Sequence, residues 1–125
     1  MSLEKIAVTA EIDNGLDSPV SGHFGHCRAF IVTTVRDGEI VQVESVPNEA
    51  HSSCADPVNR LVGLGVNVLI TLGMGMRPYM AAQQVGLAVV RGGGATVGDA
   101  IQTYLAGRGE MMGSDGLCSG GGAHQ

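Results

Sequence analysis

The sequence predicts an α/β domain built on a mixed five-stranded sheet with three helices. Three observations point to this class. Short apolar runs rich in β-branched residues recur in the lengths typical of strands. The first three runs follow one another without a helical pattern between them, whereas the later ones alternate with amphipathic segments. Glycine, proline or aspartate marks most of the boundaries between segments.

The N-terminal part of the chain predicts three strands joined as an antiparallel meander. KIAVTA at 5–10 is typical of a buried strand, and AFIVTTV at 29–35 predicts a second one. Residues 36–38 (RDG) have the chemistry of a tight hairpin turn, because glycine tolerates a positive φ. EIVQVESV at 39–46 alternates apolar and polar residues, so we expect a half-exposed third strand that ends at Pro47.

The rest of the chain predicts helices that alternate with buried strands. Asp56 as N-cap and Pro57 at the first helical position open the first helix. Thr96 and Asp99 resemble the capping box that begins a helix. In chain order, we expect a helix from 56 to just before Gly65, a strand at 67–72, a helix from about 78 to just before Gly86, a strand at 87–90 and a helix from about 96 to 106.

This order of elements predicts how the strands are arranged. Sequential strands tend to be neighbours and crossovers are right-handed, which favours the strand order 3-2-1-4-5 with helices on both faces. That is a ribonuclease H-like arrangement. We expect one domain over residues 4–107. Residues 108–125 hold six glycines and little periodicity, so they predict a flexible Gly-rich tail.

Composition and charge exclude several classes of partner. The chain of 125 residues carries seven Lys and Arg against twelve Asp and Glu, a formal charge of −5, which leaves no basic face for a phosphate backbone. No stretch approaches the roughly 20 apolar residues of a membrane span, and no secretion signal is recognisable. We therefore expect a cytoplasmic protein without nucleic-acid or membrane partners, whose three cysteines are ligands or free thiols.

Two short clusters of histidine and cysteine predict a metal site. The stretch SGHFGHCRAF at 21–30 holds His23, His26 and Cys27, and a second cluster holds His51 and Cys54. One cluster precedes the predicted hairpin and the other follows it, so the two should meet at its open end. Imidazole and thiolate suit zinc, copper and iron–sulfur centres. We therefore take all five residues as candidate metal ligands, with His23 the weakest of them.

Glycines and arginines are expected at the same edge. If the strands at 5–10, 67–72 and 87–90 are parallel, the loops after them open where ligands bind in α/β sheets. Glycines there allow close backbone approach and leave N–H groups for an anion, and arginines supply positive charge. The candidates for holding an anionic cofactor are Gly25, Arg28, Gly73, Gly75, Arg77 and Arg91.

Each of these features also has a structural interpretation. The histidines could be hydrogen-bonded loop residues, and Cys27 could be a small buried hydrophobe. Met74 and Met76 are soft thioethers that we interpret as packing residues, and no Walker lysine follows them. Cys118 and His124 in the tail are weaker ligand candidates.

The acids of the first loop allow an enzymatic alternative. Glu11, Asp13 and Asp17 could be read as nuclease carboxylates. A two-metal nuclease needs carboxylates that converge from the strands, whereas these crowd into one loop. The pattern therefore argues against this alternative.

Several motifs together resemble the dinitrogenase iron–molybdenum cofactor biosynthesis family, which includes NifX and the C-terminal domain of NifB. They are HFGHC before a strand, PNEAH at 47–51, GMGMR after the fourth strand, the GLAVV strand and a Gly-rich turn into the last helix. The resemblance covers about residues 4–107 and is greatest to stand-alone members. It implies a ribonuclease H-like fold and the binding or carrying of iron–sulfur and iron–molybdenum cluster precursors.

Three functions remain open at this point. The first is a non-enzymatic protein that binds or carries a metal or metal–sulfur cluster, either an iron–sulfur or iron–molybdenum type precursor or another transition metal. The second is a regulatory module without its own metal, which binds a ParA/Mrp-like ATPase or a cofactor-assembly protein, since some stand-alone members of the family accompany such ATPases. The third is a nuclease-like enzyme. Metal content separates the first two, and loss of activity on removing the acids would identify the third.

Overall fold

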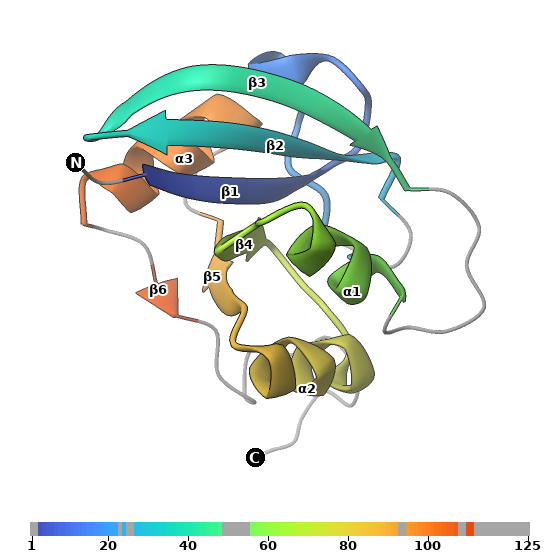
Figure 1. Cartoon of the computed structure of the whole chain (residues 1–125). Helices are drawn as coiled ribbons and strands as arrows, with labels where there is room; N and C mark the ends of the chain where they lie inside the picture. The colour runs from blue at the N-terminus through green and yellow to red at the C-terminus, as the bar shows by residue number, and fades with distance from the viewer. Residues whose placement is uncertain are drawn as a thin grey trace.

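The strands form one mixed sheet with helices on both faces (Figure 1). The computed structural model describes residues 3–22, 24, 27–48, 56–92, 95–107 and 110–111. The strand order is β3-β2-β1-β4-β5-β6, so the predicted order 3-2-1-4-5 is confirmed. A two-residue strand, β6 (Glu110–Met111), adds an antiparallel partner to the outer edge of β5. It lies in the segment expected to be a flexible tail, and two residues are too few to show a period.

The first three strands form the predicted meander. β1 (Leu3–Ala10) pairs antiparallel with β2 (Ala29–Arg36), which pairs antiparallel with β3 (Glu39–Pro47). The turn between β2 and β3 has φ values of 52° at Asp37 and 87° at Gly38, as a tight two-residue hairpin requires.

β3 is more exposed than its alternating pattern predicts. It is the outermost strand of the sheet, so only one side of its backbone is paired. Val41 and Val43 are 56% and 41% exposed, and Val46 is its one buried side chain. The pairing also shifts register between Thr34 and Val35, which interrupts the alternation.

The second half of the chain alternates helices and strands as predicted. The elements are α1 (Asp56–Gly63), β4 (Val68–Thr71), α2 (Met76–Val85), β5 (Ala88–Arg91) and α3 (Val97–Leu105). β4 runs parallel to β1, and β5 runs parallel to β4. The Thr96 hydroxyl accepts a hydrogen bond from the Asp99 N–H at 3.2 Å, so the predicted cap of α3 is confirmed.

α2 begins earlier than expected, and α1 is buried along one side only. α2 begins at Met76 and not near Pro78. Pro78 is its third residue, where the backbone N–H has no intrahelical partner and its absence costs little. On α1, Val58 and Leu61 are fully buried, whereas Val62 is 36% exposed and Leu64, just after the helix, is 37% exposed.

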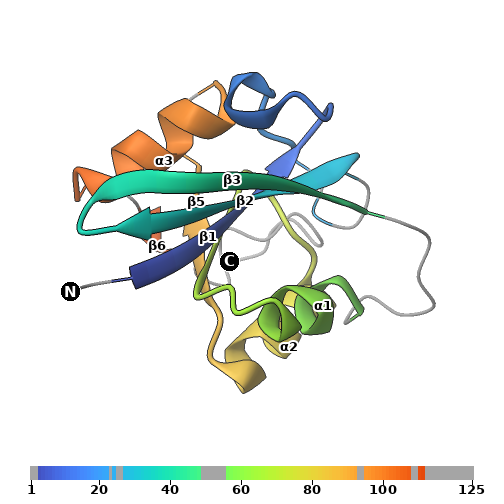
Figure 2. The same cartoon turned by 45° about the horizontal axis from the view of Figure 1, so that its top comes forward.

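Two apolar layers hold the sheet between the helices. Figure 2 shows α1 and α2 on one side of the sheet and α3, with the short 3-10 helix η1 (Gly15–Asp17), on the other. The first layer includes Phe24, Phe30, Leu61, Leu69 and Met74. The second includes Ile6, Val8, Ile31, Ile70 and Ile101. Among the described residues, no helix has the length and apolar character of a membrane span.

Candidate functional site

The ends of four strands define one edge of the sheet, which we call the carboxyl edge. β1, β4 and β5 are parallel and end there, at Ala10, Thr71 and Arg91. β3 ends at the same edge, because Pro47 pairs with Ala29 and Ala29 pairs with Ala10. In Figure 1 the end of β3 and the start of β2 lie together on the right of the molecule. The loops before and after the hairpin therefore begin at the same edge, as the sequence predicts.

The first loop runs across this edge. The Ser21 N–H donates to Thr9 O at 2.9 Å, and the Leu72 N–H donates to Ser21 O at 3.4 Å. Further along, the Phe24 N–H donates to Gly73 O at 3.2 Å. On the side of β5, Val20 N–H donates to Ala95 O at 3.1 Å. The loops that follow β1, β4 and β5 are therefore joined to one another, as the parallel arrangement predicts.

Beneath this crossing lies a pair of buried hydroxyls that sequence reasoning missed. Thr9 and Thr71 are both fully buried, and their Oγ1 atoms are 3.0 Å apart. Thr9 Oγ1 lies 2.9 Å from Ser21 O, and Thr71 Oγ1 lies 3.0 Å from Gly73 O. The only signal in the sequence is a threonine near the end of each of two apolar strands.

Cys27 lies at this edge, but inside the core. Its side chain is 4% exposed and belongs to the same apolar layer as Phe24 and Phe30. Its Sγ donates to Phe24 O at 3.4 Å. Burial raises the pKa of the Cys27 thiol to about 11, because loss of hydration disfavours the thiolate. In this geometry Cys27 is a neutral packing thiol, and a ligand role requires it to lose its proton and reach solvent.

Asn48 connects the two loops of the hairpin and was not predicted. Its N–H donates to Arg28 O at 3.1 Å, and its Nδ2 donates to Cys27 O at 3.0 Å. The same amide lies 3.6 Å from Cys27 Sγ. The second loop therefore starts in direct contact with the end of the first.

The remaining proposed ligands are not placed. His23, Gly25, His26, His51 and Cys54 lie outside the described residues, as do Cys118 and His124. The expected closeness of Cys27 and Cys54 therefore stays a prediction. Within the ranges that the structure describes, no group of three His, Cys, Asp or Glu side chains is arranged to hold a metal ion.

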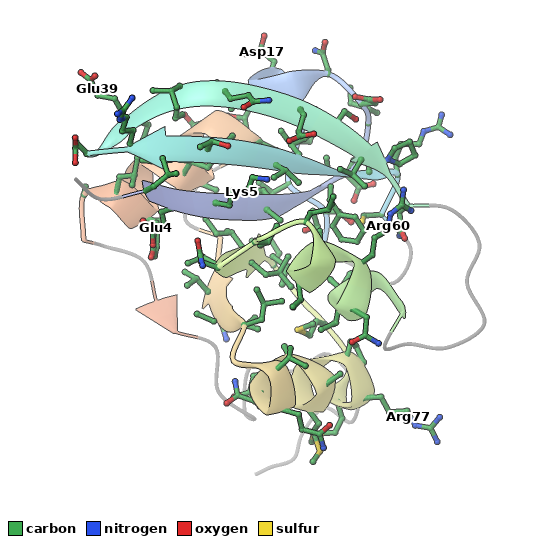
Figure 3. The ribbon with its side chains drawn as sticks, in the orientation of Figure 1. Glu4, Lys5, Asp17, Glu39, Arg60 and Arg77 are labelled. Atoms are coloured by element: carbon green, nitrogen blue, oxygen red, sulfur yellow. The ribbon has the colours of Figure 1, made fainter. Side chains whose placement is uncertain are left out.

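The arginines and glycines lie at the carboxyl edge in different settings. Arg28 and Arg77 are exposed, and Figure 3 shows Arg77 projecting outward from the first turn of α2. Arg91 ends β5 and is also exposed. Gly73 is buried, with its N–H 3.4 Å from Thr71 Oγ1. Gly75 is the N-cap of α2.

One further glycine and two methionines lie in or near the loops of this edge. A Cβ at Gly92 would lie 3.2 Å from Leu72 Cδ2, so glycine there permits a close approach of the loops. Met74 is fully buried, which confirms its interpretation as a packing residue. Met76 is 43% exposed, so the same interpretation of Met76 was wrong. Met76 is the first residue of α2, where it is not enclosed by the core that buries Met74.

The acids of the first loop do not form a catalytic group. Glu11, Asp13 and Asp17 are all exposed. Asp17 lies in η1 and points away from the sheet in Figure 3. This geometry gives no support to a two-metal nuclease.

Comparison with protein families gives one match that spans nearly the whole described fold. The model of the family described as "Dinitrogenase iron-molybdenum cofactor" matches residues 4–107. Among curated proteins, an uncharacterized protein of Methanocaldococcus jannaschii is 30% identical over 112 residues, which cover 86% of this chain and 91% of that protein.

Solved structures share the fold. The apo form of the orange protein from Desulfovibrio gigas is 31% identical, with a TM-score of 0.77, and the match covers 89% of this chain and 94% of that one. A candidate NifB protein from Thermotoga is also 31% identical, with a TM-score of 0.73 and coverage of 86% and 92%.

Proposed function

Because the chain belongs to the dinitrogenase iron–molybdenum cofactor family, we propose that it is a non-enzymatic carrier of a metal or metal–sulfur cluster. The observation that carries this proposal is the convergence of four strand ends and their loops on one edge of the sheet. Ligands in α/β sheets bind outside such an edge. The cargo would be an iron–sulfur or iron–molybdenum type cluster, a precursor of one, or another transition metal.

The proposed ligands come from the two loops of the hairpin. His26 and Cys27 would act from the first loop and His51 and Cys54 from the second, with His23 as a further candidate. The contacts of Asn48 support this pairing, because they hold the start of the second loop against Cys27. Binding through Cys27 would have to release a proton, since only the thiolate is a ligand.

The charge distribution supports an anionic cargo. The chain carries a formal charge of −5, so a negative cluster needs local positive groups to be held. Arg28 and Arg77 are exposed at the carboxyl edge, and Arg91 ends β5 at the same edge. Gly73 and Gly75 of the loop after β4 are the glycines of this edge at which a cluster would approach the backbone, and Gly25 is proposed for the same role from the sequence. The cytoplasm, where cluster assembly proteins work under reducing conditions, is the proposed location.

Anaerobic purification followed by elemental analysis and an absorption spectrum tests this function. We expect transition metal in the wild type, with sulfide if the cargo is a cluster, and a clear loss in Cys54→Ala. Cys118→Ala is the matched control, because it removes a thiol from the tail and should leave the metal content unchanged. A wild-type protein that neither retains nor takes up metal under these conditions would refute the proposal.

A second candidate function is a docking module for a ParA/Mrp-like ATPase or a cofactor-assembly protein. The observation that favours it is the exposure of Leu72 and Met76, 45% and 43%, beside the carboxyl edge. Apolar side chains at a rim are suited to protein contact. A partner bound by metal-free protein, with no metal uptake by the chain itself, would favour this function over the first.

A further inference from the structure

Two buried threonines stand out in strands that are otherwise apolar at their centre. Thr9 is the last but one residue of β1, and Thr71 is the last residue of β4. The parallel register aligns Val8 with Ile70, so the next residues, Thr9 and Thr71, are neighbours. Both side chains are fully buried. A buried hydroxyl is costly unless it forms a hydrogen bond, so their partners indicate what they hold.

Each hydroxyl carries one hydrogen, and this limits how the pair can bond. Thr9 Oγ1 can donate to Ser21 O at 2.9 Å or to Thr71 Oγ1 at 3.0 Å. Thr71 Oγ1 can donate to Gly73 O at 3.0 Å, and it lies 3.5 Å from Ser21 O. If each hydroxyl donates to its nearest carbonyl, the Thr9 hydroxyl donates to Ser21 O and the Thr71 hydroxyl donates to Gly73 O.

Those two carbonyls belong to the two loops that cross at the carboxyl edge. Ser21 O also accepts from Leu72 N–H at 3.4 Å, and Gly73 O also accepts from Phe24 N–H at 3.2 Å. Phe24 is 1% exposed, its ring packs 5.4 Å from that of Phe30, and its carbonyl accepts from Cys27 Sγ. A continuous set of contacts thus runs from the hydroxyl pair through Gly73 and Phe24 to Cys27.

We propose that Thr9 and Thr71 form a positioning pair that fixes the backbone at Ser21 and at Phe24 against Leu72 and Gly73. The pair thereby sets the depth at which Phe24 and Cys27 are buried. Its consequence for cluster binding rests on the proposed function, whereas its effect on the loops does not. The hydroxyls do not touch the cargo; they act through the loop backbone.

Thr33 offers a matched control for a purely structural role. It is also fully buried in a central strand, and its Oγ1 donates to a carbonyl, Ile6 O, at 3.2 Å. That carbonyl belongs to β1 and lies within the sheet, not in a site loop. Replacing either threonine by valine keeps the shape and removes one buried hydroxyl, so general destabilisation should be similar in Thr71→Val and Thr33→Val.

The test compares local opening in the full-length protein. Hydrogen exchange of the Phe24 amide is measured by NMR, and native-state alkylation of Cys27 is followed by peptide mass spectrometry. We expect both rates to rise about tenfold more in Thr71→Val than in Thr33→Val, because one hydrogen bond that holds the loop is lost. Thr9→Val should raise them as well. Thr71→Ser, which keeps the hydroxyl, should restore rates close to those of the wild type.

Equal changes in Thr71→Val and Thr33→Val would overturn the positioning role, as would a failure of Thr71→Ser to restore slow exchange. If Thr71→Val does not fold, Thr9→Val and Thr71→Ser carry the same comparison. A third readout, iron uptake under anaerobic conditions, should fall in Thr71→Val and stay unchanged in Thr33→Val. A wild type that takes up neither iron nor another transition metal would refute the proposed function alone, because the exchange and alkylation rates do not depend on metal.

Discussion

Cys27 can be interpreted from its sequence motif either as a metal ligand or as a small buried hydrophobe. The residue is 4% exposed, and its sulfur donates to the Phe24 carbonyl, as expected of a small buried side chain. Its neighbour Arg28 is exposed. The side-chain amide of Asn48, from the second loop, contacts both the carbonyl oxygen and the sulfur of Cys27. The thiol is therefore buried in the core at the carboxyl edge. A ligand role requires it to lose its proton and to become exposed.

Truncating Cys27 should lower stability. Cys27→Ala removes a buried sulfur from the layer that holds Phe24 and Phe30, which we expect to cost about 1–2 kcal/mol in the free energy of unfolding at pH 7. Denaturant unfolding of the wild type and the variant measures it. Cys118→Ala, in the tail, is the control. A variant as stable as the wild type would show that the sulfur is not packed as described.

The stability difference should also depend on pH. The folded-state pKa of Cys27 is raised from 9.0 to about 11, so its thiol form is favoured by folding. The associated stabilisation is fully present below pH 9 and is lost as the pH rises towards 11. The difference in the free energy of unfolding between the wild type and Cys27→Ala should therefore become smaller between pH 8.5 and pH 11, roughly the window between the two pKa values. A difference that stays constant over this range would contradict the raised pKa.

The contribution of the Arg77 charge to anion binding can be tested directly. It is the second residue of α2, where a cation is mildly unfavourable for the helix dipole, so its removal should not destabilise the fold. We expect Arg77→Ala to weaken binding of a thiometallate anion a few-fold at low salt, and less at high salt as the charge is screened. Arg36→Ala, at the opposite edge of the sheet, is the matched control. Equal affinities of wild type and Arg77→Ala at low salt would remove the arginine from the site.

At the scale of elements, the β2–β3 hairpin gives the site its frame. Ala29 pairs with Pro47, so the loops before and after the hairpin must begin side by side. Asn48 adds a side-chain bond to Cys27 O at 3.0 Å across that junction. This arrangement follows from the turn at Asp37 and Gly38 together with the register shift between Thr34 and Val35, which set the pairing of the two strands.

Two asparagine variants should lose similar stability but differ in metal uptake. Asn48→Ala and Asn67→Ala each delete one amide that bonds to backbone, at Cys27 O and Lys5 N respectively. Both should cost about 1 kcal/mol of stability. Only Asn48→Ala should reduce anaerobic metal uptake, since Asn67 lies at the other edge of the sheet. Parallel losses of uptake in the two variants would show that the hairpin junction has no special role.

The elements that the sequence predicted are those with strong patterns. β1, β4 and β5 are runs of apolar residues between breakers, and the Thr96 cap marks α3. The early start of α2 was missed because Pro78 looks like a first helical residue, although the first turn tolerates it at its third position. β6 was missed because its two residues acquire their conformation from β5 and not from their own sequence.

At the scale of the whole molecule, the topology was predictable and the chemistry of the edge only partly so. The order of elements was enough to place the loops of β1, β4 and β5 together. The Thr9–Thr71 contact was not predictable, because it depends on the parallel register of two strands about 60 residues apart in sequence. For Cys27 the sequence left two interpretations open, a metal ligand and a small buried hydrophobe, and the burial that favours the second depends on packing with Phe24 and Phe30.

The central claim is that this chain carries a metal or metal–sulfur cluster at the carboxyl edge. Native mass spectrometry of the full-length protein, reconstituted anaerobically with iron and sulfide, tests it most directly. The account predicts one bound species per chain whose mass increment contains metal, and its loss in a His51→Ala, Cys54→Ala double variant but not in a Cys118→Ala, His124→Ala double variant. A wild type that shows only the apo mass, or a His51→Ala, Cys54→Ala variant that loads as fully as the wild type, would contradict it.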